Sequence, residues 1–222
     1  MNFETAREEL IERLVRNGYL KSRAVIEAMR KVPRELFVPT ERRESAYEDR
    51  PLPIGNNQTI SAPHMNAMMC ELLELREGMK IFEVGTGSGY HAALCAEIVN
   101  PGGTGTGHVH TVERHRGLYL RAREVLESTG YASSVTVYHG DGTKGCKRHA
   151  PFDRILVTAA GPDVPPPLEE QLADGGIICI PVGRSGYSQD LYVVKKEGGV
   201  LRKKRICGVA FVPLVGEFGF PS

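Results

Sequence analysis

The sequence lacks an excess of charge of either sign. Its 222 residues include 28 Lys and Arg against 27 Asp and Glu, so the formal net charge at pH 7 is +1. Proteins that attract nucleic acid through their overall field are strongly basic, so this balance argues against a nucleic-acid partner. Apolar residues at 41% and charged residues at 25% are ordinary for a globular chain and exclude disorder as its general state.

Paired cysteines and long apolar runs are also absent from the sequence. The cysteines are scattered without a C-x-x-C pair, so neither a zinc site nor a disulfide framework is indicated, and we expect buried, reduced thiols and no metal. No apolar run approaches the roughly 20 residues that span a bilayer, and the chain opens with charged residues rather than a hydrophobic signal segment. We therefore expect a cytoplasmic protein without a membrane partner.

Strands and helices alternate through the middle of the chain. Apolar periodicity predicts helices over 4–17 and 22–32, a stretch without sustained period over 39–63, and a helix over 65–75. Such a long irregular stretch inside a compact domain is usually a functional loop. The expected strands are 80–84, 108–113, 134–138, 153–159 and 177–182, with helices at 90–99, 118–128 and 168–172 between them. Two antiparallel strands, 190–195 and 199–212, are expected at the end of the chain, joined by a turn at Glu197-Gly198-Gly199.

This order predicts one α/β domain over 1–222, a doubly wound and mostly parallel sheet with helices on both faces. Residues 1–64 would form N-terminal helices and an active-site loop. Residues 65–189 would form a nucleotide-binding core, and 190–222 a C-terminal antiparallel hairpin that carries a substrate edge. The Gly- and Thr-rich stretch 101–107 reads as a surface insertion.

A glycine-rich turn follows the first of these strands, with Gly85, Gly87 and Gly89 at alternate positions. Glycines there let a ligand lie directly against the main chain at the carboxyl end of a strand. The dinucleotide pattern G-x-G-x-x-G places its third glycine one position later. In addition, Glu83 would repel a pyrophosphate but suits a nucleoside that bears a sulfonium or ammonium group. An NAD-linked enzyme is therefore the least favoured interpretation.

Two acidic residues stand at the next strand ends. Glu113 could accept two ribose hydroxyls, and Asp141 could accept an adenine amino group while the N–H of Gly142 faces a ring nitrogen. Each residue has a plainer interpretation, because Glu113 could be a surface acid beside Arg114 and Asp141 a turn former between glycines. The prediction of a nucleoside site rests on the glycine turn and both acids falling at successive strand ends.

The segment Gln58-Thr59-Ile60-Ser61-Ala62-Pro63 precedes the helix that leads into this turn. A Q-T-I-S-x-P segment upstream of a glycine turn is a hallmark of the protein-L-isoaspartate O-methyltransferases, and the sequence closely resembles that family over nearly its whole length. Other matching segments are 32–34, 37–39, 46–47, 52–55, 83–90, 140–142, 150–153, 157–160, 175–176, 180–183 and 211–214. Asn66 and Val215 stand where some relatives carry histidine and threonine, which puts individual contacts in doubt.

The resemblance implies a protein repair enzyme with the Rossmann-like fold of class I methyltransferases. Such an enzyme transfers a methyl group from S-adenosyl-L-methionine to the free α-carboxylate of L-isoaspartyl residues in damaged proteins and peptides, and releases S-adenosyl-L-homocysteine. The ester then cyclises to a succinimide that hydrolyses partly to normal aspartate. A carboxylate is already ionised at pH 7, so the transfer needs no general base and no metal.

The resemblance also assigns roles to residues. Ser61 and Thr59 would act in catalysis by orienting the carboxylate. The expected cofactor-binding residues are Thr59, Ile60, Ser61, Glu83, Gly85, Thr86, Gly87, Ser88, Glu113, Arg114, Asp141 and Gly142. The expected substrate-binding residues are Ile60, Ser61, His64, Val212 and Leu214. By residue type alone, Ser61 could instead cap the following helix, and His64 could pack or donate a hydrogen bond rather than transfer protons.

The remaining expectations concern partners. An isoaspartyl peptide must pass the site on both sides, and backbone pairing with an exposed strand at 211–214 is one way to accept variable sequence, although this segment could also be an ordinary core strand. The basic run 202–205 reads as a solvated hairpin face rather than an RNA site, and the family resemblance favours a monomer. A methyltransferase for RNA or small molecules, or a non-catalytic cofactor-binding protein, is the alternative.

Overall fold

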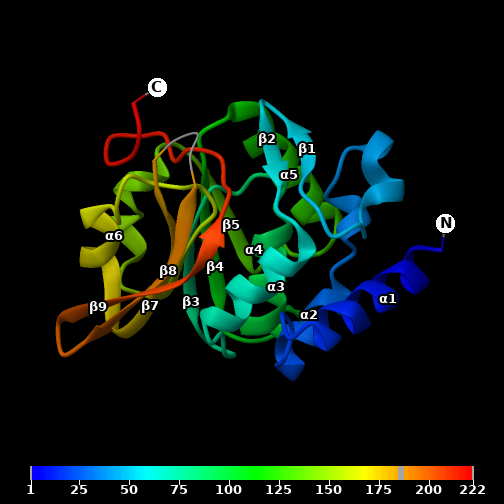
Figure 1. Ribbon diagram of the computed structural model, residues 1–222, viewed down its shortest axis with the longest axis horizontal. Helices are drawn as coiled ribbons and strands as arrows, with labels where there is room; N and C mark the ends of the chain where they lie inside the picture. Colours follow the sequence, from blue (N-terminus) through cyan, green and yellow to red (C-terminus); the bar gives the residue numbers. More distant parts are fainter. Residues whose placement is uncertain (1, 185–187, 222) are drawn as a thin grey trace.

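The computed structural model describes residues 2–184 and 188–221. The described residues form one seven-stranded sheet in the order β5-β4-β3-β6-β7-β8-β9 (Figure 1). Its strands are β3 (Lys80–Val84), β4 (His108–Glu113), β5 (Val135–His139), β6 (Phe152–Val157), β7 (Leu172–Gly183), β8 (Gln189–Glu197) and β9 (Val200–Val209). The strands from β3 to β7 are parallel to their neighbours, whereas β8 and β9 are added antiparallel. The predicted doubly wound sheet with a C-terminal hairpin is confirmed.

The central strand β3 illustrates why short, mostly apolar segments form the parallel strands of this sheet. It pairs with β4 on one side and β6 on the other, and four of its five residues are buried. A strand covered on both faces needs an apolar run rather than an alternating pattern. Phe82 packs against Phe152 of β6, with ring centroids 5.1 Å apart. The carboxyl ends of β3, β4 and β6 therefore meet at one edge of the sheet.

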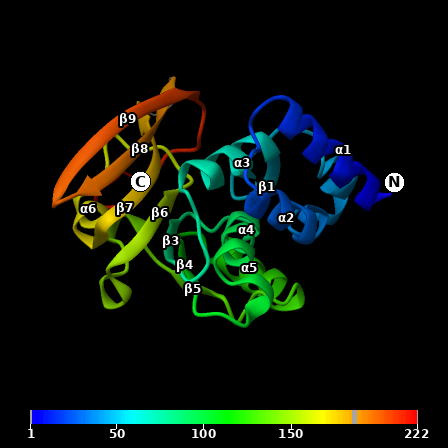
Figure 2. The same cartoon turned by 90° about the horizontal axis from the view of Figure 1, so that it is seen from below.

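Helices cover both faces of the sheet. Helices α4 (Tyr90–Val99) and α5 (Arg116–Ser128) pack on one face, and α6 (Pro166–Gln171) lies on the other (Figure 2). Helices α1 (Phe3–Arg16), α2 (Arg23–Lys31) and α3 (Pro63–Leu72) form a further layer next to α4. Helices α1 and α2 lie at the opposite end of the molecule from the β8–β9 hairpin, and α3 lies between them and the hairpin (Figure 2). Among the described residues, no helix combines the length and hydropathy needed to cross a membrane.

The stretch 39–63 is more regular than the sequence predicted. Short 3-10 helices, η1 (Arg34–Leu36) and η2 (Thr40–Ser45), lead into a hairpin of β1 (Leu52–Gly55) and β2 (Gln58–Ile60). Its turn residues Asn56 and Asn57 have φ values of 53° and 56°, a left-handed conformation that asparagine tolerates better than most residues. This hairpin presents the end of β2 toward the edge of the main sheet (Figure 1).

Other short elements lie between the main strands. They are η3 (Pro101–Gly103), η4 (Gly142–Lys144) and η5 (Lys147–His149). Residues 101–106 are exposed and Gly107 is buried, so most of the stretch 101–107 lies at the surface as expected, and its being an insertion stays a prediction. The predicted last strand was too long, because β9 ends at Val209. Residues 211–214 lie beside Ala160 instead, which donates its N–H to the carbonyl of Val212 and accepts the N–H of Leu214. These hydrogen bonds occupy one side of the segment, and the expected pairing of 211–214 with a substrate strand stays a prediction.

Candidate active site

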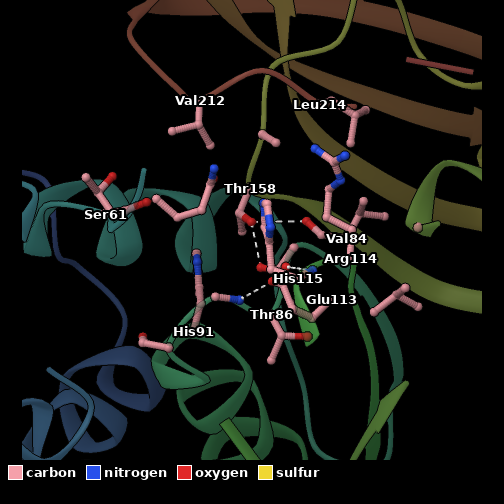
Figure 3. Close-up of a pocket in the computed structure, with 18 of the residues that line it drawn as sticks. Ser61, Val84, Thr86, His91, Glu113, Arg114, His115, Thr158, Val212 and Leu214 are labelled. Atoms are coloured by element: carbon pink, nitrogen blue, oxygen red, sulfur yellow. Dashed lines mark hydrogen bonds between the residues drawn. The ribbon is translucent and has the colours of Figure 1, made fainter. Parts of the chain in front are cut away.

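A cavity opens where the carboxyl ends of β3, β4 and β6 face the β1–β2 hairpin, and together with the open solvent at its mouth it encloses about 800 Å³. It is lined from both sides, by the hallmark segment and by the sheet, and the C-terminal residues 212–215 cover it (Figure 3). The lining residues are Gln58, Thr59, Ile60, Ser61, Asn66, Val84, Gly85, Thr86, Gly87, Ser88, His91, Val112, Glu113, Arg114, His115, Gly140, Gly142, Thr158, Ala159, Val212, Pro213, Leu214 and Val215.

The glycine turn forms the floor of the cavity. Gly85, Gly87 and Gly89 all have positive φ, at 94°, 54° and 87°. At Gly85 a side chain is also excluded by space, because a Cβ atom would lie 2.4 Å from Oγ1 of Thr158. That hydroxyl donates to the carbonyl oxygen of Gly85 at 2.7 Å, which fixes the turn against β6. Packing against Thr158 therefore requires glycine at this position, and the close approach of main chain to a ligand stays a prediction.

Glu113 stands at the end of β4 and lines the cavity. Its Oε2 accepts the N–H of Gly87 at 2.9 Å, and its Oε1 accepts the N–H of His115 at 2.8 Å. The residue is only 4% exposed, so the interpretation as a surface acid is wrong. Each carboxylate oxygen can accept a second hydrogen bond. Glu113 therefore both holds the glycine turn and can accept hydroxyl groups of a ligand.

Glu83 does not line the cavity, contrary to the direct contact expected from the sequence. It is fully buried below the turn, where its Oε2 accepts the hydroxyl of Thr111 at 2.6 Å. The Thr111 oxygen in turn lies 2.7 Å from the hydroxyl of Thr86, which must be the donor of that bond. Burial raises the pKa of Glu83 to about 7. A group shielded in this way supports Thr86 rather than touching a ligand.

Asp141 also takes a different position from the expected one. Its Oδ1 accepts the N–H and the hydroxyl of Thr143, and its Oδ2 accepts the N–H of Glu217. It faces a shallow hollow beside the cavity, so the plainer interpretation as a turn former describes what its carboxylate does here. Gly142 does line the cavity, and a Cβ there would lie 2.6 Å from Cγ1 of Val84. Main chain approaches the site closely at this strand end too.

The hallmark segment places Ser61 and Thr59 on the wall opposite the glycine turn. Ser61 follows the end of β2 and lies on one side of the cavity (Figure 3). Helix α3 begins at Pro63 with Ala62 as its N-cap, and no side chain caps it. The alternative that Ser61 caps this helix is therefore wrong. Ile60 is buried beside it, which leaves the Ser61 side chain at the border between apolar and polar surface.

His64 is the third predicted residue that does not line the cavity. Its backbone N–H and its Nδ1 both contact Oδ1 of Asp49, at 2.9 and 2.8 Å, and its ring lies 5.2 Å from that of Tyr19. The interpretation as a packing and hydrogen-bonding residue fits these contacts. His64 is thus held by Asp49 and is not among the residues that line the cavity.

Several lining residues were not predicted. Asn66 and His91 come from helices α3 and α4, His115 follows Glu113, and Thr158 follows β6. The Nε2 atom of His115 is buried and lacks a hydrogen-bond partner among the described residues. A strand-end position could have indicated His115 and Thr158, as it did Glu113. No sequence signal points to Asn66 and His91, because the packing of two helices brings them to the wall.

Cys70, His91 and Cys95 are the described residues with metal-ligand spacing, their ligand atoms lying within 4.8 Å of one another. Oδ1 of Asn66 accepts from Arg34, so its amide group donates to Nδ1 of His91 at 3.1 Å. The His91 proton must then sit on Nε2, which donates to the sulfur of Cys70 at 3.4 Å. A hydrogen bond from Cys95 further lowers the pKa of Cys70 to about 6. As arranged, the ring nitrogen donates rather than coordinates.

The remaining lining residues fit a nucleoside. Two glycine positions exclude any side chain, Glu113 offers acceptors for hydroxyl groups, and the buried Nε2 of His115 offers an unused polar atom. A parallel sheet that carries a glycine turn at one strand end and an acidic residue at the next is the nucleoside-binding edge of a doubly wound α/β fold, the class of folds to which the S-adenosylmethionine-dependent class I methyltransferases belong. The fold and the site place this protein in that class.

Comparison with known proteins identifies the family within this class. The family model of protein-L-isoaspartate(D-aspartate) O-methyltransferase matches residues 5–219. The chain is 58% identical to the protein-L-isoaspartate O-methyltransferase of Methanothrix thermoacetophila over 214 residues, 96% of this chain and 97% of the relative. It is 55% identical to that of Hyperthermus butylicus over 222 residues, 98% of this chain and 92% of the relative.

A solved structure gives the same result. It is assigned to a protein-L-isoaspartate O-methyltransferase of Plasmodium falciparum in complex with S-adenosyl-L-homocysteine. It superposes with a TM-score of 0.85 at 28% identity, and the match covers 97% of this chain and 99% of that one. The chain belongs to the protein-L-isoaspartate (D-aspartate) O-methyltransferase family. The predicted family, fold class, enzyme class and cofactor are confirmed.

Proposed function

We propose that this protein transfers a methyl group from S-adenosyl-L-methionine to the free α-carboxylate of L-isoaspartyl residues in damaged proteins and peptides. The observation that carries the proposal is the position of the hallmark segment. Thr59, Ile60 and Ser61 form one wall of the same cavity whose opposite wall is the glycine turn with Glu113. The membership of the chain in the repair methyltransferase family supports this substrate over RNA or a small molecule.

The cofactor is held by the sheet side of the cavity. In this proposal Gly85, Gly87 and Gly142 let it lie against main chain, and Glu113 accepts its ribose hydroxyls. Thr86 and Ser88 border the turn, and Arg114 lies at the mouth. When bound, the cofactor supplies an electrophilic methyl group. Glu83 contributes indirectly through Thr111 and Thr86, and Asp141 through the turn that positions Gly142.

The substrate carboxylate is held by the opposite wall. The hydroxyls of Ser61 and Thr59 donate hydrogen bonds that orient it, and no residue needs to remove a proton because a carboxylate is ionised at pH 7. Ile60, Val212 and Leu214 surround this point with apolar surface, which excludes water and strengthens each hydrogen bond. Orientation of the reacting groups is the main contribution that such a site makes to the rate.

The whole chain acts as one domain, with residues 1–64, 65–189 and 190–222 each contributing a wall or cover of the cavity. We further propose that it works as a cytoplasmic monomer without a nucleic-acid partner. The basic run 202–205 supports the absence of a nucleic-acid partner, since Arg202, Lys203 and Arg205 form ion pairs with Glu197, Asp163 and Asp190. Neutralised cations of this kind offer little attraction to phosphate.

The test is a methylation assay with a labelled methyl donor and two peptides that differ only in carrying isoaspartate or aspartate. The parent protein should label the isoaspartyl peptide and leave the aspartyl peptide unlabelled. Ser61→Ala should reduce kcat about 10- to 100-fold, the cost of an orienting hydrogen bond, with the Kd for S-adenosyl-L-homocysteine nearly unchanged. Equal labelling of both peptides would reject the proposed substrate, and an unchanged kcat would remove Ser61 from the reaction.

A further inference from the structure

A buried arginine lies directly behind the hallmark segment. Arg34, on η1, is 0% exposed, and its guanidinium donates to three neutral acceptors. Nε donates to the carbonyl oxygen of Ala46 at 2.8 Å, Nη1 to Oδ1 of Asn66 at 3.1 Å, and Nη2 to the carbonyl oxygen of Ser61 at 2.7 Å. Its Cζ also lies 4.9 Å from the ring centre of Tyr90. One planar group thus joins four separate segments.

The bond to Ser61 is the one with a consequence for the site. Ser61 lies between the end of β2 and the start of α3, and the helix offers it no cap interaction. Nη1 and Nη2 belong to the same rigid fork, so the Ser61 carbonyl is held at a fixed place relative to Asn66 on α3. Movement of this carbonyl would displace the Ser61 side chain, which lines the cavity.

The hydrogen bonds that begin at Arg34 also extend to the helix that follows the glycine turn. Asn66 passes the hydrogen bond on to His91, and Tyr90 lies against the guanidinium; both residues belong to the first turn of α4, directly after the glycine turn. Because a guanidinium only donates, the direction of every bond from Arg34 through Asn66 to His91 is fixed. The positions of the hallmark segment and of the helix start after the glycine turn are therefore both fixed by hydrogen bonds that begin at Arg34.

Burying a cation costs free energy of folding unless hydrogen bonds compensate for its lost hydration. Burial lowers the pKa of Arg34, although an arginine stays protonated in a folded protein. Its hydrogen bonds satisfy carbonyl groups that an apolar residue would leave unpaired. A lysine could keep the charge but could not reach three acceptors in one plane.

We propose that Arg34 is a positioning residue for methyl transfer, which sets the place of Ser61 relative to the cofactor-binding turn through the carbonyl of Ser61. The inference rests on the proposed function, since it takes Ser61 as the residue that orients the substrate carboxylate. Arg34 acts through Ser61 and touches neither substrate nor cofactor.

The experiment compares Arg34→Lys with Arg154→Lys. Arg154 is a matched control, because it is also buried and donates to backbone carbonyls, of Leu73 and Asp153, but it lies near the amino end of β6, away from the cavity. Arg34→Lys should lower kcat about 100-fold, the cost of misplacing a reacting group by an ångström. The Kd for S-adenosyl-L-homocysteine should stay within about threefold, as the turn keeps its contacts with Glu113 and Thr158. Arg154→Lys should lower the melting temperature with kcat within about twofold of the parent.

Hydrogen–deuterium exchange supplies a readout that does not need turnover. With S-adenosyl-L-homocysteine bound, Arg34→Lys should speed exchange of the backbone amides over 58–62, while Arg154→Lys should leave them at the rate of the parent. Equal kcat losses and equal exchange in both variants would overturn the inference and leave a purely structural role. A kcat retained in Arg34→Lys but lost in Arg34→Gln would overturn it in favour of a charge effect. If the parent protein fails to methylate isoaspartyl peptide, the proposed function fails, and the exchange data alone decide whether Arg34 positions the segment.

Discussion

At the scale of single residues, some polar side chains both hold the backbone of the cavity in place and line the cavity. Glu113 is the clearest example, because its two oxygens already accept the N–H groups of Gly87 and His115 and still face the cavity. A residue used in this way shapes the site before any ligand arrives. Thr158 does the same for Gly85, since its hydroxyl donates to the carbonyls of Val84 and Gly85.

The substitution Glu113→Gln tests this arrangement. Glutamine has one carbonyl oxygen, so its amide group must face one of the two N–H donors, and the charge that strengthens both bonds is lost. We expect the Kd for S-adenosyl-L-homocysteine to rise about 10- to 100-fold by isothermal titration calorimetry. Glu124→Gln, on the exposed face of α5, is the matched control and should bind normally. Unaltered affinity in Glu113→Gln would show that this carboxylate plays no part in cofactor binding.

At the scale of elements, the sequence was most informative where a strand is buried on both faces. Mostly apolar runs predicted strands at 80–84 and 153–159, which match β3 and β6 although β6 ends at Val157. The glycine turn and Glu113 then followed from the ends of the strands 80–84 and 108–113. The hairpin of β1 and β2 was missed because its strands have only four and three residues. Alternate burial of Leu52 and Ile54 is too short a pattern to separate from a loop.

The part of the site built by contacts between elements could not be read from the sequence. Asn66 and His91 are adjacent only because α3 packs beside α4, and Arg34 reaches Ser61 across 27 positions of chain. Asp141 and Glu83 were assigned to the ligand by residue type, but their hydrogen bonds go to neighbouring residues instead. Residue type predicted which groups gather at the sheet edge, and packing decided which of them face the cavity.

A histidine cluster between β4, β5 and η5 gives a pH dependence at this scale. His110 stacks on His149 with ring centres 4.1 Å apart, and burial, then His149, His108, Lys80 and Arg148, lower the pKa of His110 to about 3. Its ordinary pKa is 6.5, so the unfolded chain binds this proton at a pH where the folded chain does not. The contribution of His110 to stability should therefore be fully present above pH 6.5 and be lost as the pH drops from there toward 3.

Melting temperatures between pH 7.5 and 4 check this, with His110→Phe as the comparison. Phenylalanine keeps an aromatic ring beside Phe152 and removes the titrating group, so the acid limb should become shallower than in the parent. Glu83 titrates in the opposite sense, because its raised pKa favours the folded state as the pH falls from about 7. Because Glu83 is present in both proteins, the difference between their melting temperatures at each pH reports the contribution of His110. Identical slopes would mean that His110 does not titrate as its surroundings imply.

At the scale of the whole molecule, the core and the cavity both cross the expected boundaries within the chain. One buried cluster runs from Leu10 of α1 through Ala92 of α4 to Leu191 of β8. The cavity draws its walls from 58–61, 84–88 and 212–215. Because all three parts of the chain contribute residues to the cavity, we expect ligand binding to stabilise all of them together.

Thermal unfolding with and without S-adenosyl-L-homocysteine tests this expectation. A ligand at 100 times its Kd stabilises the folded state by about 2.7 kcal/mol. For a protein of this size each kcal/mol raises the melting temperature by about 2–4 °C, so the shift should be roughly 5–11 °C. The parent should unfold in one transition that moves as a whole, and Glu113→Gln at the same ligand concentration should shift less. A second transition that stays in place when ligand is added would identify a part of the chain that folds independently of the site, and the single domain over 1–222 would then be wrong.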